Sequence, residues 1–207
     1  RSRTINFEGK MDREIAIYSI KDMSVSKTEH INHVFRKVTV FKNSIEKNTE
    51  VIILSGGGLV LPYFKSRDKW KIVLVSQFRP AVLKRTLEAP GGRLDSEPPA
   101  IALSRELLEE AGIKVRPQSI VIVVNEYTHP SILSTQNIGG IVKVKANMVK
   151  NKKKAGKKSE NEWTQVEVFD LIDILRKRDY GRIIIDLMTS RLIDEVAKTV
   201  GLLVKKY

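Results

Sequence analysis

The sequence contains no cysteine, so disulfide bonds contribute nothing to its stability. At 207 residues the chain is long enough to bury a core without such cross-links. It also lacks any apolar run near the roughly 18 residues that a membrane-spanning helix needs. Because absent cysteine fits a reducing compartment, we expect an intracellular protein of the cytoplasm or an organelle matrix, with no membrane as partner. The first residue is Arg1, which leaves an upstream targeting segment as an open alternative.

Acidic residues are missing from one long stretch of the chain, between Tyr127 and Ser159. The net charge is +13, and much of the excess lies in this stretch. Its lysines are Lys143, Lys145, Lys150, Lys152, Lys153, Lys154, Lys157 and Lys158. Residues 151–161 have no large apolar side chain, which predicts a loop. The loop is either a solvated basic segment or a site for anions such as RNA, although it lacks the aromatic side chains on which single-stranded nucleic acids stack.

The pattern of apolar residues predicts a mixed protein of strands and helices. Strands are expected at 33–40, 50–54, 58–64, 71–78, 120–124, 140–145 and 163–168. Helices are expected at 99–111, 170–177 and 184–199, the last with Leu187, Leu192, Ile193, Val196 and Val200 on one face. This order favours a mixed α/β fold over a regular βαβ repeat.

The segment from Glu88 to Val115 carries the most informative pattern. Ala89-Pro90-Gly91-Gly92 should end a strand and allow a tight turn. Ser96 or Glu97 is expected to cap the following helix, with proline in its first turn, and Gly112 to end it.

Three carboxylates of that helix, Glu106, Glu109 and Glu110, fall within about 100° of arc on one face. Like charges on adjacent turns repel each other, and acids near a helix C-terminus oppose the macrodipole. A divalent cation would relieve both costs, and Mg²⁺ or Mn²⁺ prefers oxygen ligands of this kind. The alternative is an exposed acidic stripe.

The spacing of the whole segment resembles the Nudix box. The matching positions are Gly91, Glu97, Arg105, Glu106, Leu107, Glu109, Glu110, Gly112 and Ile113. The resemblance implies a Nudix-type α/β/α sandwich with a mixed sheet, and Mg²⁺- or Mn²⁺-dependent hydrolysis of a nucleoside diphosphate linked to another group.

Carried over by position, the resemblance implies roles for individual residues. Glu106, Glu109 and Glu110 would be the metal ligands, together with the backbone carbonyl of Pro90 or Gly91, and Arg105 would orient the acids. Glu97 would support the start of the helix, and Gly91, Glu97 and Gly112 are the structural positions of the box.

Gln77-Phe78-Arg79-Pro80 ahead of Glu88-Ala89-Pro90-Gly91 is similar to the ADP-ribose pyrophosphatase branch of the family. That similarity implies that Arg79 and Glu88 contact substrate. A guanidinium can hold a phosphate through two hydrogen bonds, whereas the alternative for Arg79 is an exposed arginine at a strand end. Phe78 and Tyr127 are each candidates for stacking on adenine or for the core.

A second similarity to this branch is Ser159-Glu160-Asn161-Glu162-Trp163. It implies that Glu160, or alternatively Glu162, acts as base or positions the attacking water; otherwise both simply balance the nearby lysines. The branch also implies a homodimer in which residues 1–50 form an N-terminal β extension, with the Nudix domain in residues 51–207.

These patterns lead to one principal hypothesis and two alternatives. The first is hydrolysis of ADP-ribose, or a similar nucleotide sugar, to AMP and a sugar phosphate. The second is a 5′-pyrophosphohydrolase for RNA ends or dinucleoside polyphosphates, suggested by the lysines of residues 143–158. The third is a non-catalytic subunit of an RNA-protein particle, which the intact acids of the box disfavour.

Overall fold

The computed structural model describes the backbone of residues 4–5, 15–27, 32–42, 45–53 and 179. It describes backbone and side chains of residues 56–79, 82–94, 97–128, 130–131, 133, 135–149, 164–178 and 185–202. The chain divides into two compact units. One contains Arg1–Gly56 and Glu126–Gln136, and the other contains Gly57–Asn125 and Asn137–Tyr207.

The strands of the first unit form an antiparallel four-stranded sheet in the order β1-β2-β3-β4. They are β1 (Thr4–Ile5), β2 (Ile15–Lys27), β3 (Asn32–Lys42) and β4 (Ile45–Ile53). The register of β2 against β3 shifts twice, between Ile17 and Ser19 and between Asp22 and Ser24. These irregularities interrupt the two-residue alternation by which a strand is recognised in sequence, and β2 was not among the expected strands.

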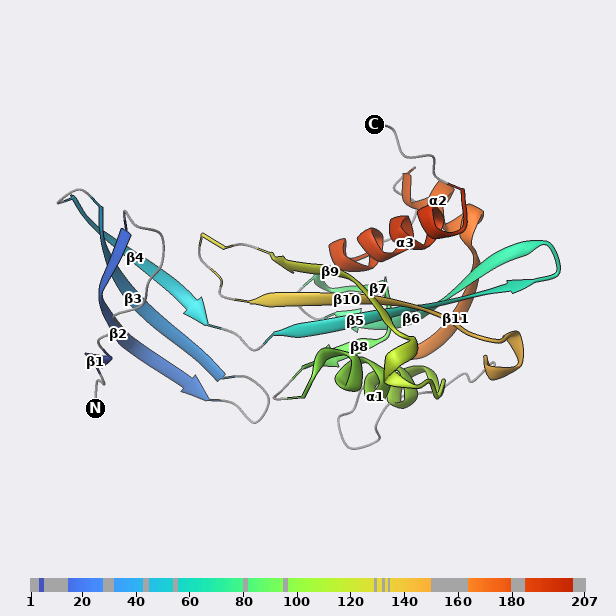
Figure 1. The fold of residues 1–207 in the computed structure, drawn as a ribbon, viewed down its shortest axis with the longest axis horizontal. Coiled ribbons are helices and arrows are strands. Elements are labelled where there is room, and N and C mark those ends of the chain that lie inside the picture. Colours follow the sequence, from blue (N-terminus) through green and yellow to red (C-terminus); the bar gives the residue numbers. More distant parts are fainter. Residues whose placement is uncertain are drawn as a thin grey trace. The chain divides into compact units, whose positions relative to one another are not determined.

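The second unit is built on a mixed sheet of seven strands (Figure 1). They are β5 (Gly57–Ser66), β6 (Lys69–Arg79), β7 (Lys84–Glu88), β8 (Gly91–Arg93), β9 (Val121–Tyr127), β10 (Gln136–Lys143) and β11 (Gln165–Asp170). The order is β11-β6-β5-β10-β9, with β7 added to β6 and β8 added to β5. Strand β10 runs parallel to β5, whereas β11 is antiparallel to β6. The expectation of a mixed α/β fold is therefore confirmed.

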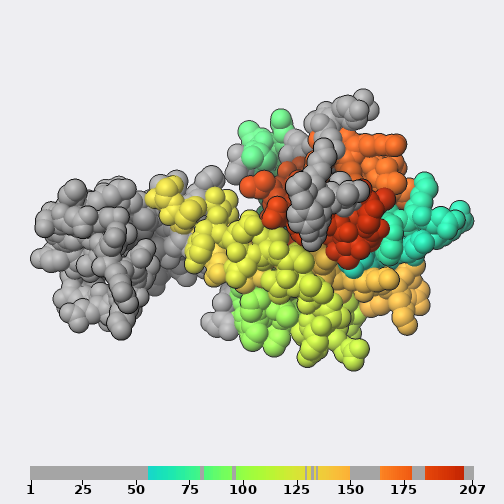
Figure 2. All heavy atoms as spheres, turned by 45° about the horizontal axis from the view of Figure 1, so that its top comes forward, coloured from blue at the N-terminus to red at the C-terminus, as the bar shows by residue number. Residues whose placement is uncertain are grey.

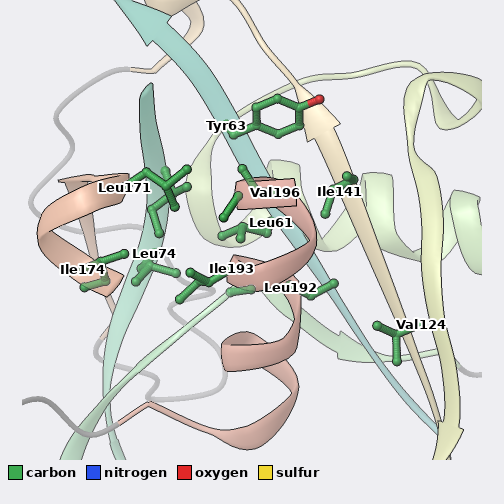
Figure 3. Packing of buried hydrophobic residues seen from close by; sticks show 13 residues of the cluster. Leu61, Tyr63, Leu74, Val124, Ile141, Leu171, Ile174, Leu192, Ile193 and Val196 are labelled. Atoms are coloured by element: carbon green, nitrogen blue, oxygen red, sulfur yellow. The ribbon is translucent and has the colours of Figure 1, made fainter. Parts of the chain in front are cut away.

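Helices cover both faces of this sheet. They are α1 (Pro99–Ala111), α2 (Leu171–Asp179) and α3 (Leu187–Thr199), with short 3-10 turns η2 (Pro117–Ser119) and η3 (Ala146–Met148). Leu103 and Leu107 of α1 pack with Val60 and Val73 on one face. The other face carries the cluster of α2 and α3 in Figure 3, which includes Leu61, Leu74, Leu171, Ile174, Leu192, Ile193 and Val196. Alternation along β5 and β6 sends neighbouring side chains to opposite layers.

The sheet splits between its two central strands. Strands β5 and β6 pair only from Tyr63 to Ser66 and from Lys69 to Ile72, next to the turn that joins them. Farther along, β6 pairs with β7 and β5 pairs with β8. Only two residues, Ala89 and Pro90, join β7 to β8. The split therefore places the end of β7 beside β6 and the start of β8 beside β5, and α1 packs over β5 and β8.

The helix predictions agree with the structure to within three residues at each end. Helix α1 has the expected bounds, and α2 and α3 differ from them slightly. Leu187 was expected on the buried face of α3 but is 79% exposed, because it is the first residue of the helix and lies beyond the packed turns. No helix among the described residues is long and apolar enough to cross a membrane.

Candidate functional site

Two prolines stand at the start of helix α1, and a glycine stands at its end. Pro98 is the N-cap residue and Pro99 the first helical residue, with no side-chain cap hydrogen bond. The expected cap by Glu97 is therefore wrong, and Ser96 lies outside the described residues. At the other end Gly112 has φ 66°, and its N–H donates to the carbonyl oxygen of Leu108 at 3.0 Å. The prediction that Gly112 ends the helix is confirmed, since glycine adopts this left-handed conformation without strain.

Burial of one face of α1 orients its glutamates toward the sheet. Leu103, Leu107 and Ala111 are packed in the core at the i, i+4, i+8 spacing of one helical stripe. Glu110 borders this stripe and is only 8% exposed. The side chains of Glu106 and Glu109 are 14% and 27% exposed. These carboxylates are thus partly withdrawn from water, unlike the acids of an exposed stripe.

Strand β8 lies directly against these carboxylates. A Cβ atom added to Gly92 would come within 2.6 Å of the carboxyl carbon of Glu106, so that carboxylate rests on the backbone of Gly92. The N–H of Gly91 donates to Glu110 Oε2 at 2.8 Å. Gly91 also approaches β5 closely, because an added Cβ would lie 2.1 Å from the carbonyl oxygen of Gly58.

The expected end of a strand before Ala89-Pro90-Gly91-Gly92 is confirmed, since β7 ends at Glu88, but the two glycines lie in the next strand and not in the turn. Among the described glycines only Gly112 and Gly201 have positive φ, so Gly91 and Gly92 make no left-handed turn. They form strand β8, where a missing side chain allows backbone and carboxylate to approach.

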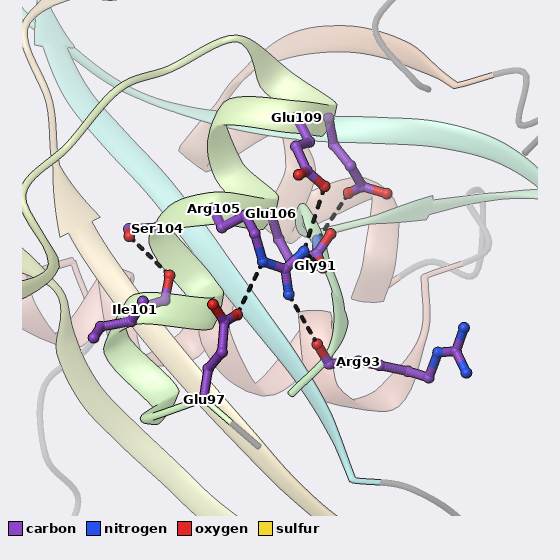
Figure 4. Close-up of polar contacts among 9 residues, drawn as sticks. Gly91, Arg93, Glu97, Ile101, Ser104, Arg105, Glu106 and Glu109 are labelled. Carbon is purple, nitrogen blue, oxygen red and sulfur yellow. Dashed lines mark hydrogen bonds and ion pairs between the residues drawn. The ribbon is translucent and has the colours of Figure 1, made fainter. Parts of the chain in front are cut away.

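Arg105 connects the acids of the helix to one another and to the strand (Figure 4). Its Nη1 donates to Glu106 Oε1 at 2.6 Å and to Glu109 Oε2 at 3.4 Å. Its Nε donates to Glu97 Oε2 at 2.9 Å, and its Nη2 reaches the carbonyl oxygen of Arg93 at 3.5 Å. Two carboxylate oxygens therefore converge on a single cationic nitrogen.

The electrostatics of Arg105 reflect these contacts. Partial burial disfavours the charged guanidinium, but the hydrogen bond to Glu97 and the charge of Glu106 outweigh it and raise the pKa of Arg105. Its side chain is 30% exposed. Arg105 is consequently a fixed positive charge in the middle of the acidic cluster.

A second polar cluster lies along the paired strands β6 and β7, between Arg79, the last residue of β6, and Glu88, the last residue of β7. Arg79 Nε donates to Glu88 Oε1 at 2.7 Å, and Arg79 Nη2 donates to Glu88 Oε2. Thr86 Oγ1 donates to Glu88 Oε1 at 2.5 Å. Burial raises the pKa of Glu88, but the hydrogen bonds from Arg79 and Thr86 and the charge of Arg79 outweigh it, so the net shift is downward. Glu88 is therefore held as a carboxylate although its side chain is only 9% exposed.

The two clusters lie on the same face of the sheet. Glu88 stands opposite Val75, which projects to the same side as Val73, and Val73 packs against α1. Arg79 shares that side because it is an even number of residues from Val75. Only Ala89 and Pro90 separate Glu88 from Gly91, whose N–H holds Glu110. The carbonyl oxygen of Pro90 accepts from Val60 N at 2.8 Å, which fixes this connection to β5.

The two aromatic candidates, Phe78 and Tyr127, are both exposed. Phe78 follows a buried residue in β6 and projects to the side opposite Arg79. Phe78 is 48% exposed and Tyr127 is 55% exposed, so the core alternative is wrong for both. Contact of Phe78 with adenine stays a prediction.

The candidate bases and most of the basic loop lie outside the described residues. Glu160 and Glu162 lie outside the described residues, as do the lysines from Lys150 to Lys158. Lys143 and Lys145 are described and exposed, and Lys143 Nζ lies 5.5 Å from the centre of the Trp70 ring. Any role of Glu160 or Glu162 as a base stays a prediction.

Two residues of α3 that the sequence analysis did not single out reach this region from the opposite layer. Thr189 Oγ1 accepts a hydrogen bond from the N–H of Ala89 at 2.7 Å. Asp186 is the N-cap of α3, and its Oδ1 accepts from Thr189 N at 3.0 Å. An aspartate directly before the first apolar residue of a helical pattern, as Asp186 stands before Leu187, is an N-cap signal, and it would have placed the start of α3 correctly.

The donor chemistry suits a hard divalent cation. Three carboxylates and the backbone oxygens of a neighbouring strand are the ligands that Mg²⁺ and Mn²⁺ prefer. Glu106 and Glu109 already converge on a cationic nitrogen of Arg105. As they stand, no three Asp, Glu or His side chains in the described part of the chain are grouped closely enough to hold an ion.

Sequence comparison identifies no family for this chain. A scan of protein-family models and a search of curated protein sequences both give no significant match. A functional assignment therefore depends on the motif and on the geometry around α1.

Proposed function

We propose that this chain is a Nudix-type hydrolase with the corresponding α/β/α sandwich. Its reaction would be hydrolysis of ADP-ribose, or a similar nucleotide sugar, to AMP and a sugar phosphate with Mg²⁺ or Mn²⁺. The observation that carries the proposal is the convergence of the Glu106 and Glu109 carboxylates on one cationic nitrogen, beside Glu110 and strand β8.

The residues of the acidic cluster would share the work of holding the ion. Glu106, Glu109 and Glu110 would supply carboxylate oxygens, and the carbonyl of Pro90 or Gly91 is the expected backbone ligand. When bound, the ion would neutralise diphosphate charge and lower the pKa of water, which is the chemistry that it supplies. Arg105 would keep the carboxylates of Glu106 and Glu109 oriented through its forked donors.

The Arg79–Glu88 cluster supports a substrate site on the same face. Glu88 binds the guanidinium through Nε and Nη2, which fixes the plane of Arg79. Because the Arg79 side chain is 46% exposed, a phosphate can approach it from solvent without displacing Glu88. In this arrangement Arg79 would bind the phosphate, and Glu88 would hold Arg79 in the orientation that binding needs.

A turnover assay over a panel of substrates tests the proposal. The panel contains ADP-ribose, NADH, nucleoside diphosphate sugars, dinucleoside polyphosphates and 5′-triphosphate RNA, each with Mg²⁺ and with Mn²⁺. We expect AMP and ribose phosphate from ADP-ribose, and no product after chelation of the metal. Absence of product from every compound would contradict the proposal and favour a non-catalytic role in an RNA-protein particle.

The metal ligands are tested by a Glu109→Gln, Glu110→Gln double variant. Loss of a residue that only hydrogen-bonds a metal ligand lowers activity by ~10–100-fold, and the loss of two ligands should lower it by more. Glu195→Gln makes the same change on α3, where Glu195 pairs with Lys198, and should leave turnover unchanged. Full turnover in the double variant would show that these acids do not bind the ion.

A second candidate substrate is RNA with a 5′-di- or triphosphate. It is favoured by basic side chains at the end of the sheet, where the β5–β6 hairpin adjoins the segment after β10 (Figure 2). The exposed basic residues there are Lys65, Arg67, Lys69, Lys143 and Lys145, although Lys69 is paired with Asp170 and the exposed Asp68 lies among them. Binding that depends on these charges should weaken steeply with salt, whereas a flat dependence or no binding removes this candidate.

A homodimer built through residues 1–50 is part of the same proposal. Light scattering during size-exclusion chromatography of the full chain, compared with a chain that begins at residue 51, measures it directly. We expect the full chain to be dimeric, and a monomeric full chain would contradict this part of the proposal.

A further inference from the structure

The connection between β7 and β8 needs an external hydrogen-bond partner. Ala89 is 1% exposed and lies where the sheet splits, between the last residue of β7 and Pro90. A buried backbone N–H that finds no partner is strongly disfavoured. The partner of this N–H is the hydroxyl of Thr189, at 2.7 Å, from a helix one hundred residues later in the chain.

Thr189 is itself held rigidly. It is completely buried, its N–H is bound by Asp186 at the start of α3, and the next turn places Leu192 and Ile193 in the core. Ile185, just before the helix, forms an isolated parallel bridge with Leu87 of β7. The start of α3 is thus attached to Leu87 of β7 and to Ala89, and Ala89 is the one closer along the chain to Gly91.

We propose that Thr189 is a positioning residue for the carboxylate site on the other face of the sheet. Its hydroxyl fixes Ala89, and through the short link to Gly91 it fixes the N–H that binds Glu110 Oε2 at 2.8 Å. Glu88, which binds Arg79, directly precedes this link. Because two residues cannot absorb a displacement of Ala89, a shift there moves both Glu110 and the Arg79–Glu88 pair. Such small misplacements at a distance lower catalytic rates strongly.

This inference rests on the proposed function for its effect on catalysis, but the hydrogen bonds it names can be tested separately. Thr189→Val replaces the hydroxyl by a methyl group of similar size, and Thr189→Ser keeps the hydroxyl. Thr199→Val makes the first change on the same helix, where Thr199 Oγ1 donates to the carbonyl oxygen of Glu195 on the exposed side. It is the matched control.

The first measurement is amide hydrogen exchange followed by NMR. In Thr189→Val the Gly91 amide should exchange at least about tenfold faster, while amides of the β6 core keep their protection. In Thr189→Ser and Thr199→Val the Gly91 amide should behave as in the wild type. Equal Gly91 exchange in Thr189→Val and wild type would overturn the proposal, as would a Ser variant that is as affected as the Val variant.

The second measurement is Mn²⁺ affinity together with steady-state kinetics. Thr189→Val should bind Mn²⁺ about 10–100-fold more weakly and lose a similar factor in kcat. KM should rise as well, because a shift of Ala89 also moves the Arg79–Glu88 pair of the expected substrate site. A change in KM alone, or unchanged affinity and kcat, would contradict the assignment.

Two further results keep the test decisive. If Thr189→Val does not fold, the exchange rate of the Ala89 amide in the wild type tests the proposal. Rapid exchange of this amide would show that its hydrogen bond to Thr189 is not maintained. If the wild type neither hydrolyses any substrate nor binds Mn²⁺, the proposed function fails. The Gly91 exchange rates then still show whether Thr189 positions the link.

Discussion

The carboxylate of Glu106 rests on the Cα position of Gly92, with no room for a side chain between them. A Cβ at Gly92 would lie 2.6 Å from the carboxyl carbon and 2.7 Å from both carboxylate oxygens of Glu106. This contact joins helix α1 to strand β8 at the centre of the acidic cluster. It explains why a glycine occurs in a strand, where the residue is otherwise unfavourable.

Substitution of Gly92 by alanine should therefore damage the site while the fold is kept. The backbone at Gly92 does not have positive φ, so alanine is tolerated there, but its methyl group must push Glu106 away. We expect roughly a 10²-fold loss of turnover. The control is Gly57→Ala in the paired strand, where the added Cβ would meet Asn137 Oδ1 at an ordinary 3.4 Å. Equal activity of the two variants would contradict the contact.

Replacing Arg105 by lysine should impair the site although the charge is retained. Arg105 binds Glu97 through Nε and Glu106 through Nη1, which lie on different edges of the guanidinium. The single ammonium group of lysine cannot reach both carboxylates in this way. We expect a loss of about 10–100-fold in Mn²⁺ affinity or activity, as for other partners that orient metal ligands. Arg191→Lys on α3 is the control, because the half-exposed Arg191 makes a loose pair with Glu195, with 3.9 Å between Nε and Oε1. Wild-type Mn²⁺ affinity in Arg105→Lys would be inconsistent with this role.

The Arg79–Glu88 pair predicts energetic coupling between the two side chains. Arg79→Gln leaves a nearly buried carboxylate with only Thr86 as donor and should cost about 1–3 kcal/mol of unfolding free energy. Adding Glu88→Gln should cost less than the sum of the single changes, with a coupling of about 0.5–3 kcal/mol. Urea unfolding of the four proteins measures this cycle. Zero coupling would instead mean that Arg79 is an exposed arginine at a strand end.

Asp186 predicts a pH dependence of stability. Burial raises the pKa of Asp186, hydrogen bonds from Thr189 oppose the shift, and the charge of Glu88 adds to it. The folded pKa thus lies above the ordinary 3.8, so the folded state binds a proton more tightly than the unfolded chain. The contribution of Asp186 to stability is present below pH 3.8 and is lost as pH rises through the folded pKa.

The Asp186→Asn variant tests this dependence, since asparagine keeps a cap acceptor for Thr189 but does not titrate. Its unfolding free energy, measured from pH 3.5 to 7, should fall less with rising pH than that of the wild type. Asp186→Ala should instead be destabilised throughout by about 0.5–2 kcal/mol, because it loses the cap. Parallel pH profiles of Asp186→Asn and wild type would show that Asp186 titrates normally.

Local signals were sufficient to predict helix α1 and the position of its acids. Proline is tolerated in a first turn and glycine ends a helix, so Pro99 and Gly112 define the bounds without reference to the rest of the chain. The helical period then puts Glu106, Glu109 and Glu110 on one face. The sequence predicted that a strand ends before Ala89 but not the bounds of β7, and it did not predict β8, because five residues of mixed polarity and a Gly-Gly-Arg tripeptide have no period that marks a strand.

The sequence by itself determined the mixed α/β class, the bounds of α1 and the order of the acids along it, since these follow from local propensity and periodicity. Only the tertiary structure decided that Gly92 receives the carboxylate of Glu106, that Arg79 binds Glu88, and that Thr189 fixes Ala89. These three contacts depend on how the sheet splits and which helix covers each face. Such pairings between distant segments arise from the packing of the whole core, which no local pattern in the chain specifies.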